Sequence, residues 1–239
     1  MADRAKSAYW QGVRDGAPFI FVVSPFAMLF GVVSAEAGLN VFEALAFSVV
    51  VIAGAAQFTA LQLLQDNAPT FVALASALAV NLRMAMYSAA LTPHLGAAPF
   101  WQRGLIAYFL VDQTYACSVM AYEKNKGWGL AQKTAYFFGT MTPVCPMWYV
   151  MTLVGAWAGA AIPPDYALDF AVPITFIALT APMLRTAAHR AAALVSVGMA
   201  LAFAWLPFNL GLMVAGLSGM ITGAQIELRL RARGTWVDP

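Results

Sequence analysis

Two charged side chains stand inside long apolar stretches of this sequence, and they are the residues best suited to chemistry. Arg83 lies in the middle of the stretch 69–91, and Asp112 lies near the middle of the stretch 103–121. In a membrane interior each such charge costs about 2.5–3.5 kcal/mol unless it meets a partner. The guanidinium of Arg83 could therefore pair with the carboxylate of a small solute, and Asp112 could carry a proton. A structural ion pair between Arg83 and Asp112 is the alternative, and it is compatible with both roles.

The polar residues next to these charges could complete a binding site. Arg83 and Tyr87 are four residues apart, so both lie on one face of a helix, and Asn81 precedes Arg83 by two residues. Gln113 directly follows Asp112. We expect Asn81 and Tyr87 to bind the solute together with Arg83, and Gln113 to assist Asp112 in proton coupling or charge pairing.

Small residues and prolines mark the positions where we expect helices to open. Gln57 follows the four small residues 53–56, which allow a neighbouring backbone to approach closely or the helix to open, so that Gln57 reaches the solute. A proline removes a backbone donor and frees a carbonyl, which a membrane tolerates only beside protein or a wet cavity. A packing contact or a static kink is the alternative at each position. The helix breaks that line the site are expected at Pro25, Gly54, Pro143 and Pro146.

The composition places these residues in a membrane protein. Of the 239 residues, 62% are hydrophobic and only 10% are charged, whereas soluble domains carry about 25% charged residues. The mean hydropathy of +0.72 agrees. No alternation typical of strands is visible, so we expect an all-α fold, a polytopic bundle of transmembrane helices. A net charge of +2 is too small to indicate nucleic acid as a partner.

Eight stretches are long enough to span a bilayer, which takes about 20 apolar residues. The last two nearly touch at 205–207, so they could instead form one hairpin or a single broken helix, and the count is seven or eight. The expected spans are 17–35, 41–65, 69–91, 103–121, 134–160, 167–185, 189–205 and 207–224.

The positions of lysine and arginine predict the orientation of the chain, because cytoplasmic loops carry more of them. Eight spans with both termini in the cytoplasm leave only Arg103 in an outer loop, whereas seven spans would place the basic tail outside. The segments then expected inside contain Arg4, Lys6, Arg14, Lys124, Lys126, Lys133, Arg185, Arg190, Arg229, Arg231 and Arg233. The domains expected are an interfacial or cytoplasmic arm over 1–16, a transmembrane permease domain over 17–224 and a basic cytoplasmic tail over 225–239.

Neither a metal site nor a catalytic site is predicted. Cys117 and Cys145 lie in apolar stretches without a CxxC pattern, which is typical of buried thiols. An intramembrane protease would need a Ser/His or Asp/Asp pair at depth, but His94 and His189 fall at span ends on opposite sides. An enzyme acting on lipid or peptide is therefore the weaker alternative to a transporter, and no cofactor is expected.

The order and spacing of several motifs resemble one known family. The chain is similar to the AzlC family of branched-chain amino acid permeases, the azaleucine-resistance proteins, from about Gly12 to about Gly223. The motifs that carry this resemblance are Phe30–Gly31, Ala53–Phe58, Asn81–Arg83 with Tyr87–Ser88, Asp112–Ala116, Asp169–Pro173 and Leu206–Pro207.

The resemblance implies export of valine, leucine and isoleucine across the bacterial cytoplasmic (inner) membrane, with a small AzlD-type membrane protein as partner. In the family pattern a Glu often follows the Asp of the fourth span, whereas Gln113 stands here, so Asp112 would act alone or the coupling would differ. No Walker motif is present, so the energy would come from an ion gradient or the solute's own gradient. Another amino acid such as methionine, or an assembly subunit without a solute, remains an alternative.

Overall fold

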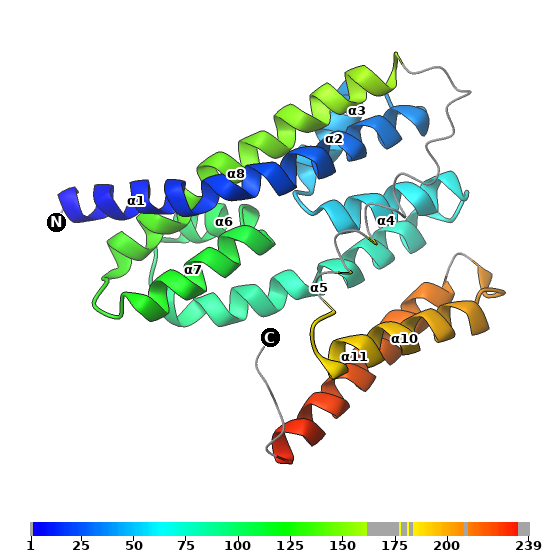
Figure 1. Cartoon of the computed structure of the whole chain (residues 1–239). Helices are drawn as coiled ribbons and strands as arrows, with labels where there is room; N and C mark the ends of the chain where they lie inside the picture. Colours follow the sequence, from blue (N-terminus) through cyan, green and yellow to red (C-terminus); the bar gives the residue numbers. More distant parts are fainter. Residues whose placement is uncertain (1, 162–176, 178–180, 182–183, 208–209, 234–239) are drawn as a thin grey trace. The chain divides into compact units, whose positions relative to one another are not determined.

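The described part of the chain is helical throughout. A computed structural model describes residues 2–161, 177, 181, 184–207 and 210–233, and it contains no strand in these ranges. The expected all-α fold class is confirmed. The expected span 167–185 lies almost entirely outside the described residues. The chain divides into two compact units, unit 1 over Met1–Gln62 and Leu74–Tyr166, and unit 2 over Leu63–Ala73 and Ala167–Pro239 (Figure 1).

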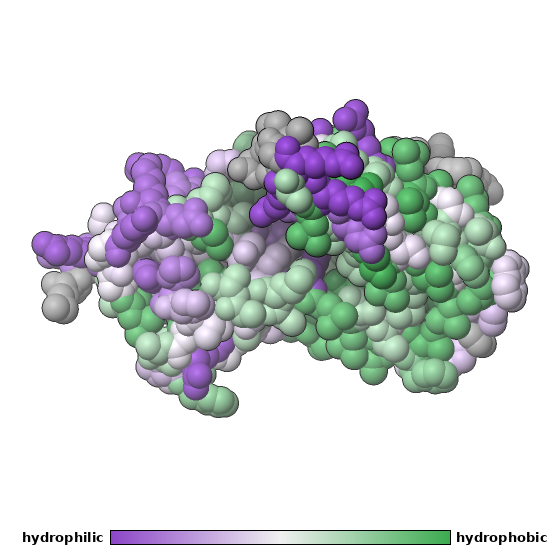
Figure 2. Space-filling model, turned by 90° about the horizontal axis from the view of Figure 1, so that it is seen from below, coloured by the Kyte–Doolittle hydropathy of each residue, from purple (hydrophilic) through white to green (hydrophobic). Residues whose placement is uncertain are grey.

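Four helices among the described residues are long and apolar enough to cross a membrane. They are Asp3–Glu36, Thr70–Leu95, Leu130–Gly159 and Leu210–Ala232. Large apolar side chains such as Phe21, Phe42 and Trp157 are exposed on the surface, and hydrophobic residues cover much of the face shown in Figure 2. Such a surface is stable in lipid rather than in water, where exposed apolar patches of this extent are rare.

Two long helical segments form the central scaffold of unit 1. The first consists of α1 (Ala2–Gly16), the short 3₁₀ turn Ala17–Phe19 and α2 (Ile20–Glu36); the second is α8 (Leu130–Gly159). They run parallel and lie side by side along their length (Figure 1). The expected arm 1–16 is thus a helix packed against α8.

Glycine allows the two backbones to approach each other. A Cβ atom at Gly31 of α2 would overlap backbone atoms of Thr152 and Ala156, and one at Gly155 of α8 would overlap the backbone of Met28. Close contact of this kind is how helices associate in lipid, where no hydrophobic effect drives them together. The contact therefore fixes α8 against α1–α2.

The expected span 41–65 is a hairpin of two short helices, which we call the first hairpin. It consists of α3 (Val41–Val50), the extended residues 51–53 and α4 (Gly54–Gln65). The Asn40 side chain accepts hydrogen bonds from the Phe42 and Glu43 N–H groups and so caps α3.

The two arms of the first hairpin lie side by side. One ring of α2, Phe30, contacts Phe47 on α3 at 5.7 Å and Phe58 on α4 at 5.4 Å, measured between ring centroids. Gln57 on α4 also donates to Ser48 on α3. The hairpin therefore enters and leaves unit 1 at the same end, beside the end of α2, and it does not cross.

The expected span 103–121 is a second hairpin that enters from the opposite end. It consists of α6 (Phe100–Tyr108), residues 109–111 and α7 (Asp112–Lys124). Trp101, near the start of α6, lines the same groove as Leu130 at the start of α8, and the Tyr122 hydroxyl of α7 donates to the Lys133 carbonyl. Both outer ends of this second hairpin thus lie where α8 begins.

Between the hairpins α5 (Thr70–Leu95) runs toward the start of α8. Its His94 ring lies 5.2 Å from the Tyr122 ring, and its Nδ1 is 3.1 Å from the Lys133 Nζ. His94 is therefore at the end of unit 1 where α8 begins, not at the opposite end, as the eight-span prediction had it. The reason is that the expected span 41–65, which precedes α5, turns back halfway and so reverses the direction of α5.

This arrangement also corrects the expected position of Arg103. Near the start of α6, it lies with the α1 and α7–α8 basic residues, whereas the prediction placed it on the other side. Apart from Arg83, every lysine and arginine of unit 1 is thus at one end, which we call the basic end. Its basic residues are Arg4, Lys6, Arg14, Arg103, Lys124, Lys126 and Lys133.

Unit 2 contains an antiparallel pair of helices, α10 (Ala187–Ala202) and α11 (Leu210–Ala232). The Ser196 hydroxyl of α10 donates to the Ala215 carbonyl of α11, and Gly223 lies against Ala192. The expected spans 189–205 and 207–224 are therefore two packed helices rather than one broken helix. The expected basic tail begins inside α11, where Arg231 pairs with Glu227 at 2.6 Å.

Candidate functional site

The tips of the two hairpins meet in the middle of unit 1. The Tyr108 hydroxyl, at the end of α6, donates a hydrogen bond of 2.5 Å to the Val49 carbonyl, in the last turn of α3. The Tyr149 hydroxyl of α8 lies 2.9 Å from the Tyr108 hydroxyl. Because a phenol has one proton and Tyr108 gives it to Val49, Tyr149 must be the donor in the second bond. Three elements are thus joined at one point.

The tip of the second hairpin is held by Thr114. Its hydroxyl accepts a hydrogen bond from the Val111 N–H at 2.9 Å, and its proton faces two acceptors, the Val111 carbonyl at 2.9 Å and the Phe109 carbonyl at 3.1 Å. These contacts satisfy backbone groups that the break between α6 and α7 removes from regular helix bonding. The break places Asp112 in the first turn of α7, where the helix dipole favours a negative charge.

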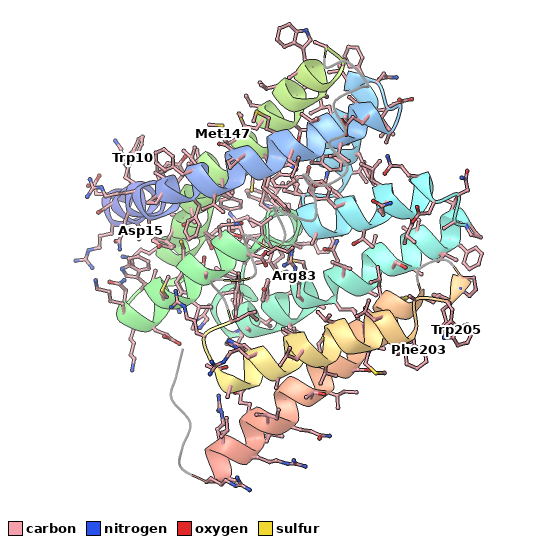
Figure 3. The ribbon with its side chains drawn as sticks, turned by 45° about the vertical axis from the view of Figure 1, so that its right-hand side comes forward. Trp10, Asp15, Arg83, Met147, Phe203 and Trp205 are labelled. Atoms are coloured by element: carbon pink, nitrogen blue, oxygen red, sulfur yellow. The ribbon has the colours of Figure 1, made fainter. Side chains whose placement is uncertain are left out.

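Arg83 and Asp112 form an ion pair beside this tip. Arg83 Nη1 lies 3.0 Å from Asp112 Oδ2, with 33% of the arginine side chain and 41% of the aspartate side chain exposed. Figure 3 shows Arg83 midway along α5, remote from Trp10 and Asp15 at the basic end. We call this ion pair the central pair.

The central pair has spare hydrogen-bonding capacity. Arg83 Nε and Asp112 Oδ1 are buried and have no hydrogen-bond partner among the described residues, and the same holds for Asn81 Oδ1. One turn further along, the Tyr87 and Tyr115 rings stack with centroids 4.1 Å apart and an angle of 12° between their planes. A donor, an acceptor and an aromatic wall are thus available beside the pair, which is unusual for a purely structural ion pair.

Around the first hairpin the polar groups are packed differently, in what we call the serine cluster (Ser48, Gln57, Trp148 and Thr152). Ser48 Oγ accepts from Gln57 Nε2 at 2.9 Å and from Trp148 Nε1 at 3.2 Å. It therefore donates its own proton to Thr152 Oγ1, 3.0 Å away. Ser48 and Thr152 are fully buried and Gln57 is 1% exposed, so the cluster is closed to solvent.

The break of the first hairpin depends on Gly54. A Cβ atom there would come within 2.5 Å of Phe26 and 2.6 Å of Trp148, because both rings cover the start of α4. The break and the serine cluster are thus built on α8 and α2 together.

The structure brings some of the predicted site residues together and separates others. Arg83, Asp112 and Tyr87 are neighbours, as expected, and Asn81 lies on the same helix with an unsatisfied oxygen. Gln113 follows Asp112 in α7 and is half-buried. Gln57 belongs to the serine cluster, where its amide serves Ser48.

The predicted proline breaks are wrong. Helix α2 continues through Pro25, and α8 continues through Pro143 and Pro146. The close glycine contacts between α2 and α8 hold both helices in shape, so the loss of single backbone bonds is tolerated. Of the four expected positions only Gly54 lies at a break.

Several residues of the site carry little signal in the sequence. Tyr108 and Tyr149 are two aromatic residues among many, and a serine or threonine in an apolar helix usually bonds its own backbone. A single hydroxyl residue such as Ser48 or Thr152 therefore does not predict a hydrogen bond to another helix. The one signal for Ser48 and Thr152 is that each is a polar residue within an apolar run.

Comparison with known proteins identifies the family. A family model described as AzlC protein matches residues 18–162, more than half of the chain. The chain belongs to the AzlC family. The matched region contains both hairpins, the central pair and the serine cluster, whereas α10 and α11 lie beyond it. The AzlC match thus covers the candidate site completely.

Relatives of this AzlC chain are membrane proteins by name. The inner membrane protein YgaZ of Escherichia coli is 23% identical over 178 residues, which cover 72% of this chain and 71% of YgaZ. An uncharacterized membrane protein of Archaeoglobus fulgidus is 27% identical over 232 residues, 92% of this chain and 96% of the relative. Another from Helicobacter pylori is 28% identical over 153 residues, 64% and 65% of the two chains. No solved structure matches.

The site holds no cluster suited to a metal ion within the described ranges. No group of three or more His, Cys, Asp or Glu side chains gathers there. Cys117 and Cys145 are both buried and free, in agreement with their interpretation as apolar packing residues. What the site offers is one cation, one anion and hydrogen-bonding groups.

Proposed function

We propose that this AzlC protein is a secondary transporter that exports branched-chain amino acids, valine, leucine and isoleucine, across the bacterial cytoplasmic membrane. The observation that supports the proposal most strongly is the central pair, since both of its charges keep a buried atom without a partner in the described part of the chain. Family membership supports the class of solute.

A zwitterion fits between Arg83 and Asp112 without a change in net charge. Its carboxylate would take the guanidinium, which binds carboxylates in two parallel hydrogen bonds, and its ammonium would take the Asp112 carboxylate. Separating the central pair in a low-dielectric interior would otherwise be costly, because each charge would lose its partner. In the bound state the solute carboxylate takes the place of Asp112 beside Arg83, and the solute ammonium takes the place of Arg83 beside Asp112.

The surroundings of the pair suit an aliphatic side chain. The Tyr87–Tyr115 stack and the apolar residues of the second hairpin lie beside the charges. Apolar contact gives affinity for leucine-like side chains but discriminates weakly between them, by about 1–3 kcal/mol per methylene. Methionine is therefore the second candidate solute.

The orientation and the partner complete the proposal. The basic end of unit 1 would face the cytoplasm, following the rule that lysine and arginine concentrate there. Asp112 would carry a proton or steady Arg83 as solute moves, with Asn81 as a further hydrogen-bonding group. A small AzlD-type membrane subunit would form the functional pair with this chain.

Efflux of preloaded, labelled amino acids tests the proposal. Cells that express the chain, with and without the small subunit, should export leucine, isoleucine and valine faster than cells with an empty vector. Isovalerate and isoamylamine share the leucine side chain but carry only one of its two charges, so neither should compete with leucine. Competition by isovalerate as strong as that by leucine would contradict a zwitterion site, and equal efflux from all strains would contradict the transport function.

A further inference from the structure

The hydroxyl pair at the hairpin tips has a role that the binding site does not require. We propose that Tyr108 and Tyr149 are positioning residues that lock the tips of the two hairpins together, and that the lock must open during each transport cycle. The inference rests on the proposed function for its place in a cycle, but the lock itself can be tested without a solute.

The lock joins two groups that helix breaks leave free. The Val49 carbonyl lies in the last turn of α3, where the carbonyls lack the regular helical partner, and it receives the Tyr108 proton instead. Tyr108 is in turn the last residue of α6, directly before the second break. One side chain thus connects a hairpin from each end of unit 1.

The direction of the hydrogen bonds makes the lock depend on Tyr149. Because Tyr149 donates to Tyr108, the Tyr108 oxygen has a fixed partner on each side, one on α8 and one on α3. Since α8 is fixed against α1–α2, Tyr149 anchors the meeting point to the rigid part of unit 1.

The arm that carries Tyr108 has few other restraints. Phe100 and Trp101 of α6 are 84% and 62% exposed, and Ile106 is the only residue of α6 that is buried. A largely apolar groove of about 630 Å³ separates α6 from α8. The helix α6 therefore has room to move, and the Tyr108 hydroxyl is a principal polar contact that opposes movement at its tip.

Cysteine labelling at the tips measures the lock directly. In the full chain with Cys117→Ala and Cys145→Ala, a single reporter is placed at the first tip (Ala53→Cys) or at the second (Leu110→Cys), both buried positions. The purified protein in lipid vesicles is then exposed to a water-soluble maleimide from both sides. Loss of one hydrogen bond to a backbone carbonyl should favour the open state by roughly two- to tenfold, so Tyr108→Phe should raise the labelling rate by that factor.

Two further variants separate a lock from a general loss of structure. Tyr149→Phe should raise labelling in the same direction but less, because the Tyr108–Val49 bond remains, and this variant carries the test if Tyr108→Phe fails to fold. Tyr9→Phe removes a comparable hydroxyl contact between helices, from Tyr9 to Thr142, away from the tips, and should leave the rate unchanged. Unchanged labelling at both reporters in both tip variants would overturn the lock.

Leucine transport distinguishes this inference from the proposed function. Tyr108→Phe should change the maximal rate of leucine export and leave the half-saturating concentration unchanged, because the central pair is intact. If the wild-type chain exports no leucine but labelling rises in Tyr108→Phe, the lock stands and the proposed function falls. If leucine is exported and both tip variants label and transport as the wild type does, the lock falls and the function stands.

Discussion

The first hairpin enters unit 1 from the end opposite to the basic residues, and the second enters from the basic end. The first keeps Ser48 bonded to three side chains in the closed serine cluster, where Gln57 Oε1 is the one atom without a partner among the described residues. The second carries Asp112, whose ion pair with Arg83 of α5 is partly exposed and has unused hydrogen-bonding atoms.

This difference indicates that the two hairpins have different roles although their helix–break–helix structure is similar. A buried polar network in which Ser48 uses all of its donor and acceptor sites stabilises one arrangement, because any shift leaves polar atoms unpaired. A partly exposed ion pair whose charged groups have free hydrogen-bonding atoms can exchange its partner for a solute at a lower cost in free energy. We therefore expect changes in the first hairpin to act on stability and changes in the second to act on transport.

The largest effect is expected from Asp112→Asn in the second hairpin. It removes the charge partner of Arg83 and of the solute ammonium, so leucine export should fall roughly 10- to 100-fold, the value of one charge-assisted hydrogen bond. Any remaining export should no longer depend on the proton gradient. Efflux at several pH values measures both effects.

Glu123→Gln is the matched control for this variant, since it removes a carboxylate from the same helix α7 at its exposed end. Export by Glu123→Gln should equal that of the wild type. If Asp112→Asn exports leucine normally and with the usual pH dependence, the second hairpin is not the transport element.

The next largest effect is expected from Ser48→Ala in the first hairpin. It leaves the Gln57 amide, the Trp148 N–H and the Thr152 hydroxyl without their partner, which should cost about 3 kcal/mol of unfolding free energy. Denaturation of the purified protein in detergent measures this loss.

Ser34→Ala provides a sharp comparison for Ser48→Ala. Ser34 is equally buried, but its hydroxyl has no hydrogen-bond partner among the described residues, so its removal should not destabilise the protein. Equal losses in both variants would mean that burial, and not the serine cluster, explains the stability of the first hairpin.

The smallest effects come from one glycine in each hairpin. Gly54→Ala forces the Phe26 and Trp148 rings to move and should cost about 1–3 kcal/mol. Gly104→Ala in α6 meets no atom within 4 Å and should stabilise its helix by up to about 1 kcal/mol. The two melting temperatures should thus shift in opposite directions, and a shared direction would contradict the difference in packing.

The sequence predicted the ion pair better than the topology. Arg83 and Asp112 could be identified because a charge in an apolar run needs a partner, and the structure pairs them. The all-helical fold followed from composition and span length in the same way. Both are local properties, which one sequence contains.

The two hairpins could not be predicted from span length. A largely apolar stretch of 25 residues such as 41–65 satisfies the length rule whether it crosses or turns back, and neither break contains a proline. What decides is tertiary contact, the rings over Gly54 and the bond between Tyr108 and Val49. Two signs were visible in the sequence: the small residues 53–56, which predicted the break at Gly54, and Arg103, which alone violated the orientation rule in the eight-span prediction.

Thermal stabilisation of the purified protein by leucine tests the central pair most directly. At a leucine concentration 100 times the dissociation constant, binding stabilises the folded state by about 2.7 kcal/mol, or about 5–10 °C in melting temperature for a chain of this size. We predict this shift for the wild type and none for Arg83→Gln, whose melting temperature without leucine is compared in parallel. An equal leucine shift in Arg83→Gln would show that the amino acid binds elsewhere and would contradict the account.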